Sequence, residues 1–312
     1  MTRNSSCANC LTVVLMWTAL IIPAWAHPWY FPVQSQLSII NPYLSPQRIT
    51  ETCPGKWQNQ LVLWEGTVVR QSGSPEKCFL ELDANGQRIP VYFVRPVKNL
   101  QIDRRGYRVA IKGKVHLENH KFCCLYGLSV ILLSPPPERS FAQWLGADKV
   151  SLSSYVAWRA SMCQPKLERQ LALAIGKTLV DTAKREHFDP LLFASLIQIE
   201  SAFDPQATSV SGAQGLGQLM PFTASGLGVA NAYDPIQNLR GSGHMVGNLF
   251  RAWENSPNQQ ALVLASYNAG PNLVRKLNGQ VPHIPETVNY VYFIGFLRQM
   301  ISAHTKALCV GA

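Results

Sequence analysis

Glu200 is the residue whose type and position best suit acid–base chemistry. It ends a nearly continuous apolar run, Leu191 to Ile199. Asp189 as N-cap and Pro190 at the first helical position predict that this run is a helix. A helix that is apolar on every face is buried inside a domain. Burial disfavours an ionised carboxyl and raises its pKa, which suits a general acid near neutral pH. The alternative is a structural glutamate that bonds a loop amide or emerges into solvent.

Four blocks of residues around and after Glu200 carry a resemblance to a known family. They are ESAFDP at 200–205 with SVSGAQGLGQLMP at 209–221, YDP at 233–235 with Asn238, ASYNAGP at 265–271, and ETVNYV at 286–291. Together they resemble the catalytic domain of the soluble-type lytic transglycosylases, which has a goose-lysozyme-like fold. The resemblance covers roughly residues 175–300. A single block occurs by chance, whereas four in order at domain-scale spacing are specific.

The resemblance implies cleavage of the β-1,4 bond between N-acetylmuramic acid and N-acetylglucosamine in peptidoglycan. Most glycosidases use two carboxylates, but the resemblance implies that Glu200 acts alone. It protonates the leaving oxygen, the N-acetyl group assists at the anomeric carbon, and Glu200 then takes the C6 hydroxyl proton as that oxygen closes onto C1. The product is a 1,6-anhydromuramoyl end, so the enzyme would be a lyase. We expect no metal and no cofactor.

The loop after Glu200 is expected to contribute three residues to the site. By its place in the block, Ser209 resembles the hydroxyl that bonds the catalytic glutamate, and Gln218 and Met220 resemble cleft residues that touch the sugar. Gly217 departs from the family, which usually has methionine there. We therefore expect a side chain to be missing from the cleft wall at Gly217.

The later blocks are expected to supply three more substrate-binding residues. Tyr267 and Asn268 resemble the pair at the floor of the site, with the tyrosine hydroxyl near the acid or the N-acetyl group. Glu286 resembles a residue on the substrate side, near the C6 hydroxyl. Two other functions remain open: a lysozyme-type hydrolase on the same fold, or a non-catalytic wall-binding protein whose cleft has decayed.

The surrounding sequence predicts an all-α domain that positions these residues. Apolar residues recur at helical spacing over 167–179, Asp234 repeats the helix-start signal, Gly270 before a proline is a stop signal, and 287–301 predicts a last helix.

Residues 55–134 predict a small OB-like β-barrel instead. Short strands are expected over 60–70, 78–82, 88–94, 107–115 and 125–133, with a hairpin turn at 83–86. OB-folds often bind oligosaccharides or single-stranded nucleic acid. Five basic residues either line such a face or are ordinary solvated positions: Arg104, Arg105, Arg108, Lys112 and Lys114.

The predicted fold class is therefore α+β multidomain, a barrel followed by a lysozyme-like helical domain. The expected segments are a signal peptide (1–26), an extended linker (27–54), the barrel (55–134), a linker and helical connection (135–165) and the transglycosylase domain (166–305). The signal peptide rests on Arg3, the apolar run 11–22 and an A-x-A site at 24–26. It predicts export to the periplasm, with an uncleaved membrane anchor as the alternative.

The composition indicates a folded chain with an anionic partner. Of 312 residues, 47% are hydrophobic and 15% charged, which excludes a disordered chain and a polytopic membrane protein. The net charge of +10 favours an acidic polymer, an anionic lipid or a nucleic acid. The resemblance selects peptidoglycan, and no nucleic acid is expected. The barrel fits a docking module for a secretion or cell-envelope assembly component. Six cysteines follow the predicted signal, so disulfides are allowed in an order that the sequence leaves open.

Overall fold

The computed structural model describes residues 59, 61–74, 77–93, 103–118, 121–136, 139–146 and 150–310. The predicted signal peptide and the linker to residue 54 lie outside this part of the chain. Within the described ranges, no helix combines the length and the hydropathy needed to cross a membrane. Cys78, Cys123, Cys124 and Cys163 are free thiols.

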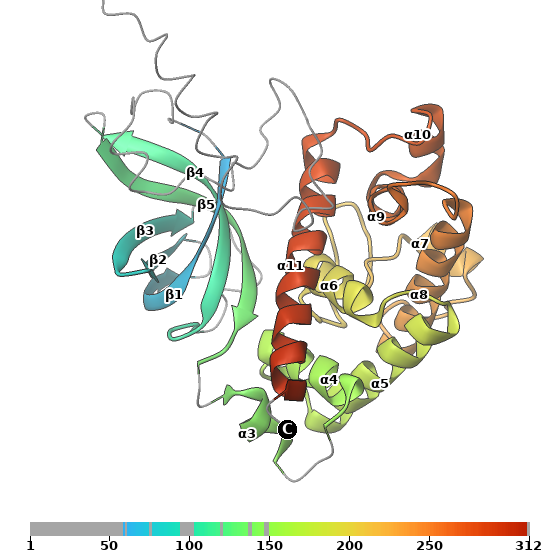
Figure 1. Ribbon diagram of the computed structural model, residues 1–312, viewed down its shortest axis with the longest axis horizontal. Helices are drawn as coiled ribbons and strands as arrows, with labels where there is room; N and C mark the ends of the chain where they lie inside the picture. Colours follow the sequence, from blue (N-terminus) through green and yellow to red (C-terminus); the bar gives the residue numbers. More distant parts are fainter. Residues whose placement is uncertain are drawn as a thin grey trace, which may run out of the picture. The chain divides into compact units, whose positions relative to one another are not determined.

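The first part of the structure is a closed five-stranded barrel, as predicted (Figure 1). The strand order around the barrel is β1-β2-β3-β5-β4, in which β3 and β5 pair in parallel and the other neighbours pair antiparallel. The strands are β1 (Leu61–Ser74), β2 (Lys77–Ala84), β3 (Gln87–Phe93), β4 (Arg108–Glu118) and β5 (Lys121–Ser134).

Local chemistry fixes the predicted hairpin between β2 and β3. Asn85 and Gly86 have φ angles of 55° and 83°, the left-handed values that a two-residue hairpin turn requires. The Gly86 N–H donates to the Asp83 carboxylate at 2.8 Å. The barrel also needs a glycine in β5, because a Cβ at Gly127 would lie 2.2 Å from the Phe93 ring.

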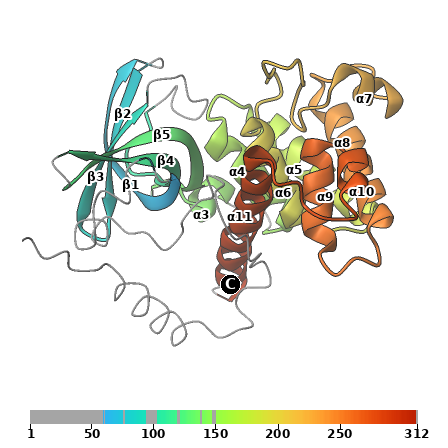
Figure 2. The ribbon, with the colours of Figure 1, turned by 90° about the horizontal axis from the view of Figure 1, so that it is seen from above.

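The second part of the structure is helical, which confirms the predicted fold class. Helix α6 lies at its centre and contacts α4, α5 and α11, and α9 packs against α8, α10 and α11 (Figures 1 and 2). The helices are α3 (Phe141–Leu145), α4 (Leu152–Cys163), α5 (Arg169–Arg185), α6 (Pro190–Ser201), α7 (Pro221–Gly226), α8 (Pro235–Ala252), α9 (Gln259–Ala269), α10 (Pro271–Lys276) and α11 (Pro285–Val310).

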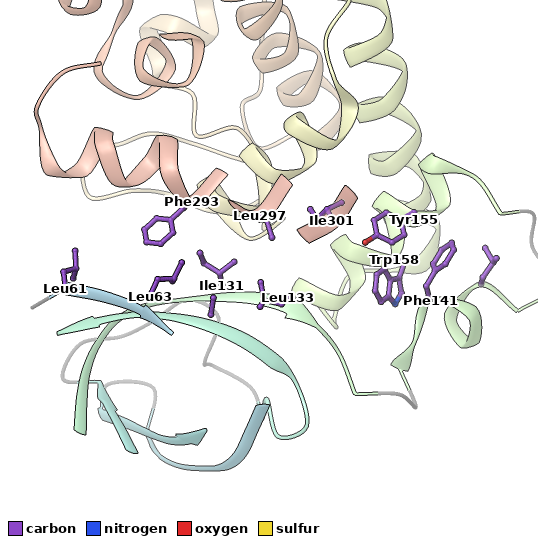
Figure 3. Close-up of a cluster of buried hydrophobic side chains, with 12 residues drawn as sticks. Leu61, Leu63, Ile131, Leu133, Phe141, Tyr155, Trp158, Phe293, Leu297 and Ile301 are labelled. Carbon is purple, nitrogen blue, oxygen red and sulfur yellow. The ribbon is translucent and has the colours of Figure 1, made fainter. Parts of the chain in front are cut away.

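A single apolar cluster joins the barrel to the helices (Figure 3). Leu61 and Leu63 of β1, with Ile131 and Leu133 of β5, point toward the face of α11 that carries Phe293, Leu297 and Ile301. Phe141, Tyr155 and Trp158 extend the cluster into α3 and α4. Because all of these side chains are buried, the barrel wall and α11 exclude water from each other.

Buried hydrogen bonds cross the same junction. The Arg159 guanidinium of α4 donates to the Leu132 and Leu133 carbonyls of β5, both at 3.2 Å, and to Gln198 Oε1 of α6 at 2.7 Å. Gln198 Nε2 in turn donates to the Leu132 carbonyl at 2.8 Å. Helix α6 is therefore tied to the barrel two residues before Glu200. We call Arg159, Gln198 and these carbonyls the junction network.

Candidate functional site

Glu200 lies in the last turn of α6, where the sequence predicts it. The Asp189 side chain caps the helix by accepting the Leu191 N–H at 2.9 Å, which confirms the predicted N-cap. The helix ends at Ser201 because the next residue, Ala202, takes a left-handed conformation with φ 53°. Glu200 is half-buried, so its carboxyl sits at the rim of the helical core rather than in bulk solvent.

The Tyr290 hydroxyl of α11 donates to Glu200 Oε1 at 2.5 Å. Burial raises the pKa of Tyr290 well above its ordinary value, and the charge of Glu200 raises it further. The phenol therefore stays protonated at neutral pH and remains a donor to the carboxyl. A charge-assisted O–H···O⁻ bond of this length is among the stronger hydrogen bonds in proteins.

The charge of Glu200 also acts on Tyr267, but the Tyr267 hydroxyl donates its hydrogen bond to a different group. Burial raises its pKa well above the ordinary tyrosine value, and the negative charge of Glu200 adds to the effect. Its hydroxyl donates to the Gly217 carbonyl at 2.7 Å. Tyr267 thus holds the loop after Glu200 against α9. Its neighbour Asn268 accepts the Thr287 hydroxyl at 2.8 Å, which joins α9 to the first turn of α11.

The predicted loop residues mainly bond the loop to itself. Ser209 Oγ accepts the Ala213 N–H at 2.9 Å. Gln218 Nε2 donates to the Ala207 and Gly215 carbonyls at 3.1 and 2.9 Å. The structure thus gives both polar side chains a role in closing the loop. Met220, immediately before α7, is 43% exposed and free to contact a ligand.

Neighbouring side chains occupy the space in which a side chain at Gly217 would begin. A Cβ at this position would lie 2.6 Å from Ser242 Cβ and 3.0 Å from Tyr267 Oη. The Gly217 N–H donates to Asn238 Oδ1 at 2.7 Å, and Asn238 Nδ2 holds the Ala232 carbonyl at 2.8 Å. A Cβ at this position would point toward α8 and α9, and the expectation that a side chain is missing from the cleft wall stays a prediction.

A cleft of about 490 Å³ lies beside Glu200, which is within the usual size range of ligand sites. Three predicted site residues line it: Glu200, Asn268 and Glu286. Ser209, Gln218, Met220 and Tyr267 are not among the lining residues. The helical lining consists of Ile199, Glu200, Asn268, Pro285, Glu286, Asn289, Tyr290 and Phe293.

Tyr290 is a site residue that was not predicted from the sequence. It belongs to the block at 286–291 and stands four residues after Glu286, so the two share a face of α11. That spacing was the available signal, because a cleft-facing glutamate in the first turn places the residue at i+4 beside it.

The barrel supplies the other lining residues, Leu61, Lys112, Lys114 and Leu128. Of the five basic residues named for the barrel face, only Lys112 and Lys114 line the cleft. Arg104 is buried and donates to two carbonyls at the end of α4. Arg105 and Arg108 form ion pairs of 2.6 Å with acidic neighbours on the barrel.

Residues 179–287 match the family model described as the Transglycosylase SLT domain. The matched segment contains Glu200 and Tyr267 and stops just before Tyr290. The predicted resemblance to the lytic transglycosylases is confirmed over this segment.

Individual transglycosylases are similar to parts of this chain. A transglycosylase of Enterobacteria phage PRD1 is 49% identical over 70 residues, which are 22% of this chain and 26% of that protein. Membrane-bound lytic murein transglycosylase F of Stutzerimonas stutzeri is 35% identical over 97 residues, 30% of this chain and 20% of that protein. The chain thus spans about a quarter or less of the length of these relatives. The 70 kDa soluble lytic transglycosylase of Escherichia coli superposes with a TM-score of 0.40 at 19% identity, over 53% of this chain and 32% of that one.

Proposed function

We propose that this chain is a peptidoglycan lytic transglycosylase with Glu200 as its only proton-transferring residue. The observation that supports this most directly is the Glu200 carboxyl, held by the Tyr290 hydroxyl at 2.5 Å on the wall of a cleft. Glu200 lies within the segment that matches the transglycosylase family model, and Tyr290 lies just beyond its end.

In the first step, protonated Glu200 donates its proton to the glycosidic oxygen between N-acetylmuramic acid and N-acetylglucosamine. The C1–O4 bond breaks, and positive charge develops at the anomeric carbon of the muramic sugar. The N-acetyl group of that sugar assists at C1. As the carboxyl loses its proton, the Tyr290 hydroxyl donates to a group of growing negative charge, so this bond strengthens toward the transition state.

In the second step, the Glu200 carboxylate takes the proton of the C6 hydroxyl, and O6 forms a bond to C1. The proton that Glu200 gave to O4 leaves with the N-acetylglucosamine, the proton from O6 protonates Glu200 again, and a 1,6-anhydromuramoyl end is produced without water. One carboxyl in alternating protonation states is sufficient for this sequence. Tyr290 cannot take over as the base at neutral pH, because its raised pKa keeps the phenol protonated.

A lysozyme-type hydrolase is the second candidate, and one observation favours it. Glu286 also lines the cleft, so a second carboxyl is available to activate water or to stabilise the oxocarbenium centre. The products separate the two reactions, because hydrolysis leaves reducing muramic ends whereas the lyase leaves anhydro ends.

The deciding experiment is digestion of purified sacculi by wild-type protein and by Glu200→Gln, followed by mass spectrometry of the soluble muropeptides. We expect anhydromuropeptides from the wild type and at least about a hundredfold less from Glu200→Gln, the usual contribution of a positioned general acid. Glu254→Gln, an exposed glutamate just beyond α8, is the matched control and should keep full activity. Full activity of Glu200→Gln with an unchanged fold would refute the assignment of the acid.

The proposed function also requires that the protein be exported to the compartment that holds its substrate. The basic Arg3, the apolar run 11–22 and the A-x-A site at 24–26 support a cleaved signal peptide and a periplasmic location. N-terminal sequencing of the protein recovered from the periplasm tests this, with a mature chain starting at His27 as the expected result.

A further inference from the structure

The barrel forms one wall of the cleft that contains Glu200. On β4, Lys112 and Lys114 are two residues apart and point to the same side of the sheet. Lys114 pairs with Leu61 of β1 and with Tyr126 of β5, so all three lie on the same face of the barrel. The helical wall opposite carries the carboxyls of Glu200 and Glu286.

Lys112 is a half-buried cation within this cleft. Its Nζ lies 5.3 Å from the centre of the Phe293 ring on α11, and burial lowers its pKa while the charge of Glu286 opposes that shift. A cation–π contact keeps the ammonium in place without neutralising it. No carboxylate of the described residues lies within 4.0 Å of the Lys112 ammonium.

Three other described cations of the barrel differ from Lys112 and Lys114. Arg88, Arg105 and Arg108 each lie near acidic residues of the barrel itself. Burying part of an ammonium without a counter-ion costs free energy, which an anionic ligand in the cleft would offset. Among the described cations of the barrel, Lys112 and Lys114 are those that line the cleft, and neither forms an ion pair with a described barrel carboxylate.

We propose that Lys112 and Lys114 bind carboxylates of the peptides carried by the glycan strand, so that the barrel makes the enzyme selective for peptide-bearing peptidoglycan. This inference rests on the proposed function. The sugars in the strand supply hydroxyl and acetamido groups, whereas the peptide supplies carboxylates. Helical residues contact the sugars at the scissile bond, and the barrel contacts the peptide from the opposite side of the cleft.

The test uses peptide-bearing glycan fragments prepared in two forms, one with free carboxylates and one in which the carboxyl groups have been converted to amides. Amidation removes the charge and keeps nearly the same shape. We expect wild-type protein to have a higher kcat/KM on the free form. Lys112→Met, which keeps the apolar stem over Phe293, and Lys114→Gln should each lower kcat/KM on that form about tenfold, the value of one hydrogen bond to a charged group. Neither should change the rate on the amidated form by more than about twofold.

Arg88→Gln is the control for general electrostatic attraction, since it removes one positive charge of the barrel at a residue that does not line the cleft. It should leave both rates unchanged. Equal losses on both substrates, or no loss on either, in Lys112→Met and Lys114→Gln would overturn the inference. A wild-type protein that cleaves neither substrate would refute the proposed function instead. In that case, binding of the two forms to Glu200→Gln still decides the role of the lysines: tighter binding of the free form that is lost in the lysine variants supports it, and equal binding refutes it.

Discussion

Replacing Tyr290 by phenylalanine removes the hydroxyl that donates to the Glu200 carboxyl and keeps the aromatic ring. The bond is 2.5 Å long and joins a neutral donor to a carboxyl that becomes charged during the first step. A hydrogen bond to a charged group contributes about 1.5–3 kcal/mol. The tyrosine hydroxyl bonds the ionised carboxyl more strongly than the protonated one. The phenylalanine variant therefore loses most of this energy in the transition state, where the carboxyl is becoming charged, rather than in the ground state.

We therefore expect kcat of Tyr290→Phe to fall about 10- to 150-fold, because each 1.36 kcal/mol of barrier is tenfold in rate. KM should change little, since the hydroxyl is committed to Glu200 rather than to a sugar. The assay is the initial rate of soluble muropeptide release over a range of sacculus concentrations, with thermal unfolding measured on the same samples.

Tyr155→Phe is the matched control. Its hydroxyl lies 3.0 Å from His304 Nδ1 at the junction of α4 and α11, so the same atom is deleted from a partly buried hydrogen bond that does not reach the cleft. This variant should lose stability but keep its kcat. If Tyr290→Phe kept full kcat with an intact fold, the hydroxyl would have no effect on the charged form of Glu200, and the reasoning above would be refuted.

Three further predictions concern stability. Gly217→Ala places a Cβ 2.6 Å from Ser242 Cβ, and overpacking of this kind costs about 1–3 kcal/mol; adding Ser242→Gly should recover at least half of the lost melting temperature, and no recovery would contradict the contact. Arg159→Met leaves the Gln198 amide oxygen without its donor and should lower the free energy of unfolding in urea by about 2 kcal/mol or more, whereas a loss below about 1 kcal/mol would show that the junction network is dispensable. Burial raises the pKa of the Cys163 thiol from 9.0 to about 11, so between these pH values the folded state keeps a proton that the unfolded state loses. The free energy of unfolding should therefore fall by about 2–3 kcal/mol as the pH rises from 9 to 11. Urea titrations at each pH should show a smaller fall for Cys163→Ala.

The features predicted correctly from the sequence are those that depend on neighbouring residues. Asp189 caps α6 through its own chain two residues on, and the turn at Asn85 and Gly86 follows from the φ angles that these residue types allow. The place of Glu200 follows from the apolar run before it. Each of these rests on contacts within a few residues, for which sequence rules are reliable.

The features that were missed depend on contacts across the fold. Helix α4 was read only as part of a connection because it is buried on nearly every side, so no alternation of apolar and polar residues marks it. Helix α4 also contains the buried Arg159, whose hydrogen-bond partners lie in β5 and α6. Tyr290 meets Glu200 across 90 positions of sequence, and no local pattern specifies that pairing.

The polar residues of the loop illustrate a different limit. Their place in a block predicts that Ser209 bonds the catalytic glutamate and that Gln218 touches the sugar, yet both side chains bond the backbone of their own loop. An amide or hydroxyl side chain can satisfy a turn or a sugar equally well. The backbone conformation decides between them, and Gln218 has a left-handed φ of 50° that sequence alone does not indicate.

The junction network fixes the distance between the barrel wall and the helical wall of the cleft beside Glu200. Swinging the barrel aside would break the bonds from Arg159 to β5 and α6 and the bond from Gln198 to the Leu132 carbonyl, at about 1.5–3 kcal/mol for each bond to the charged group. A ligand in the cleft therefore meets two walls whose spacing is set by buried hydrogen bonds rather than by the ligand.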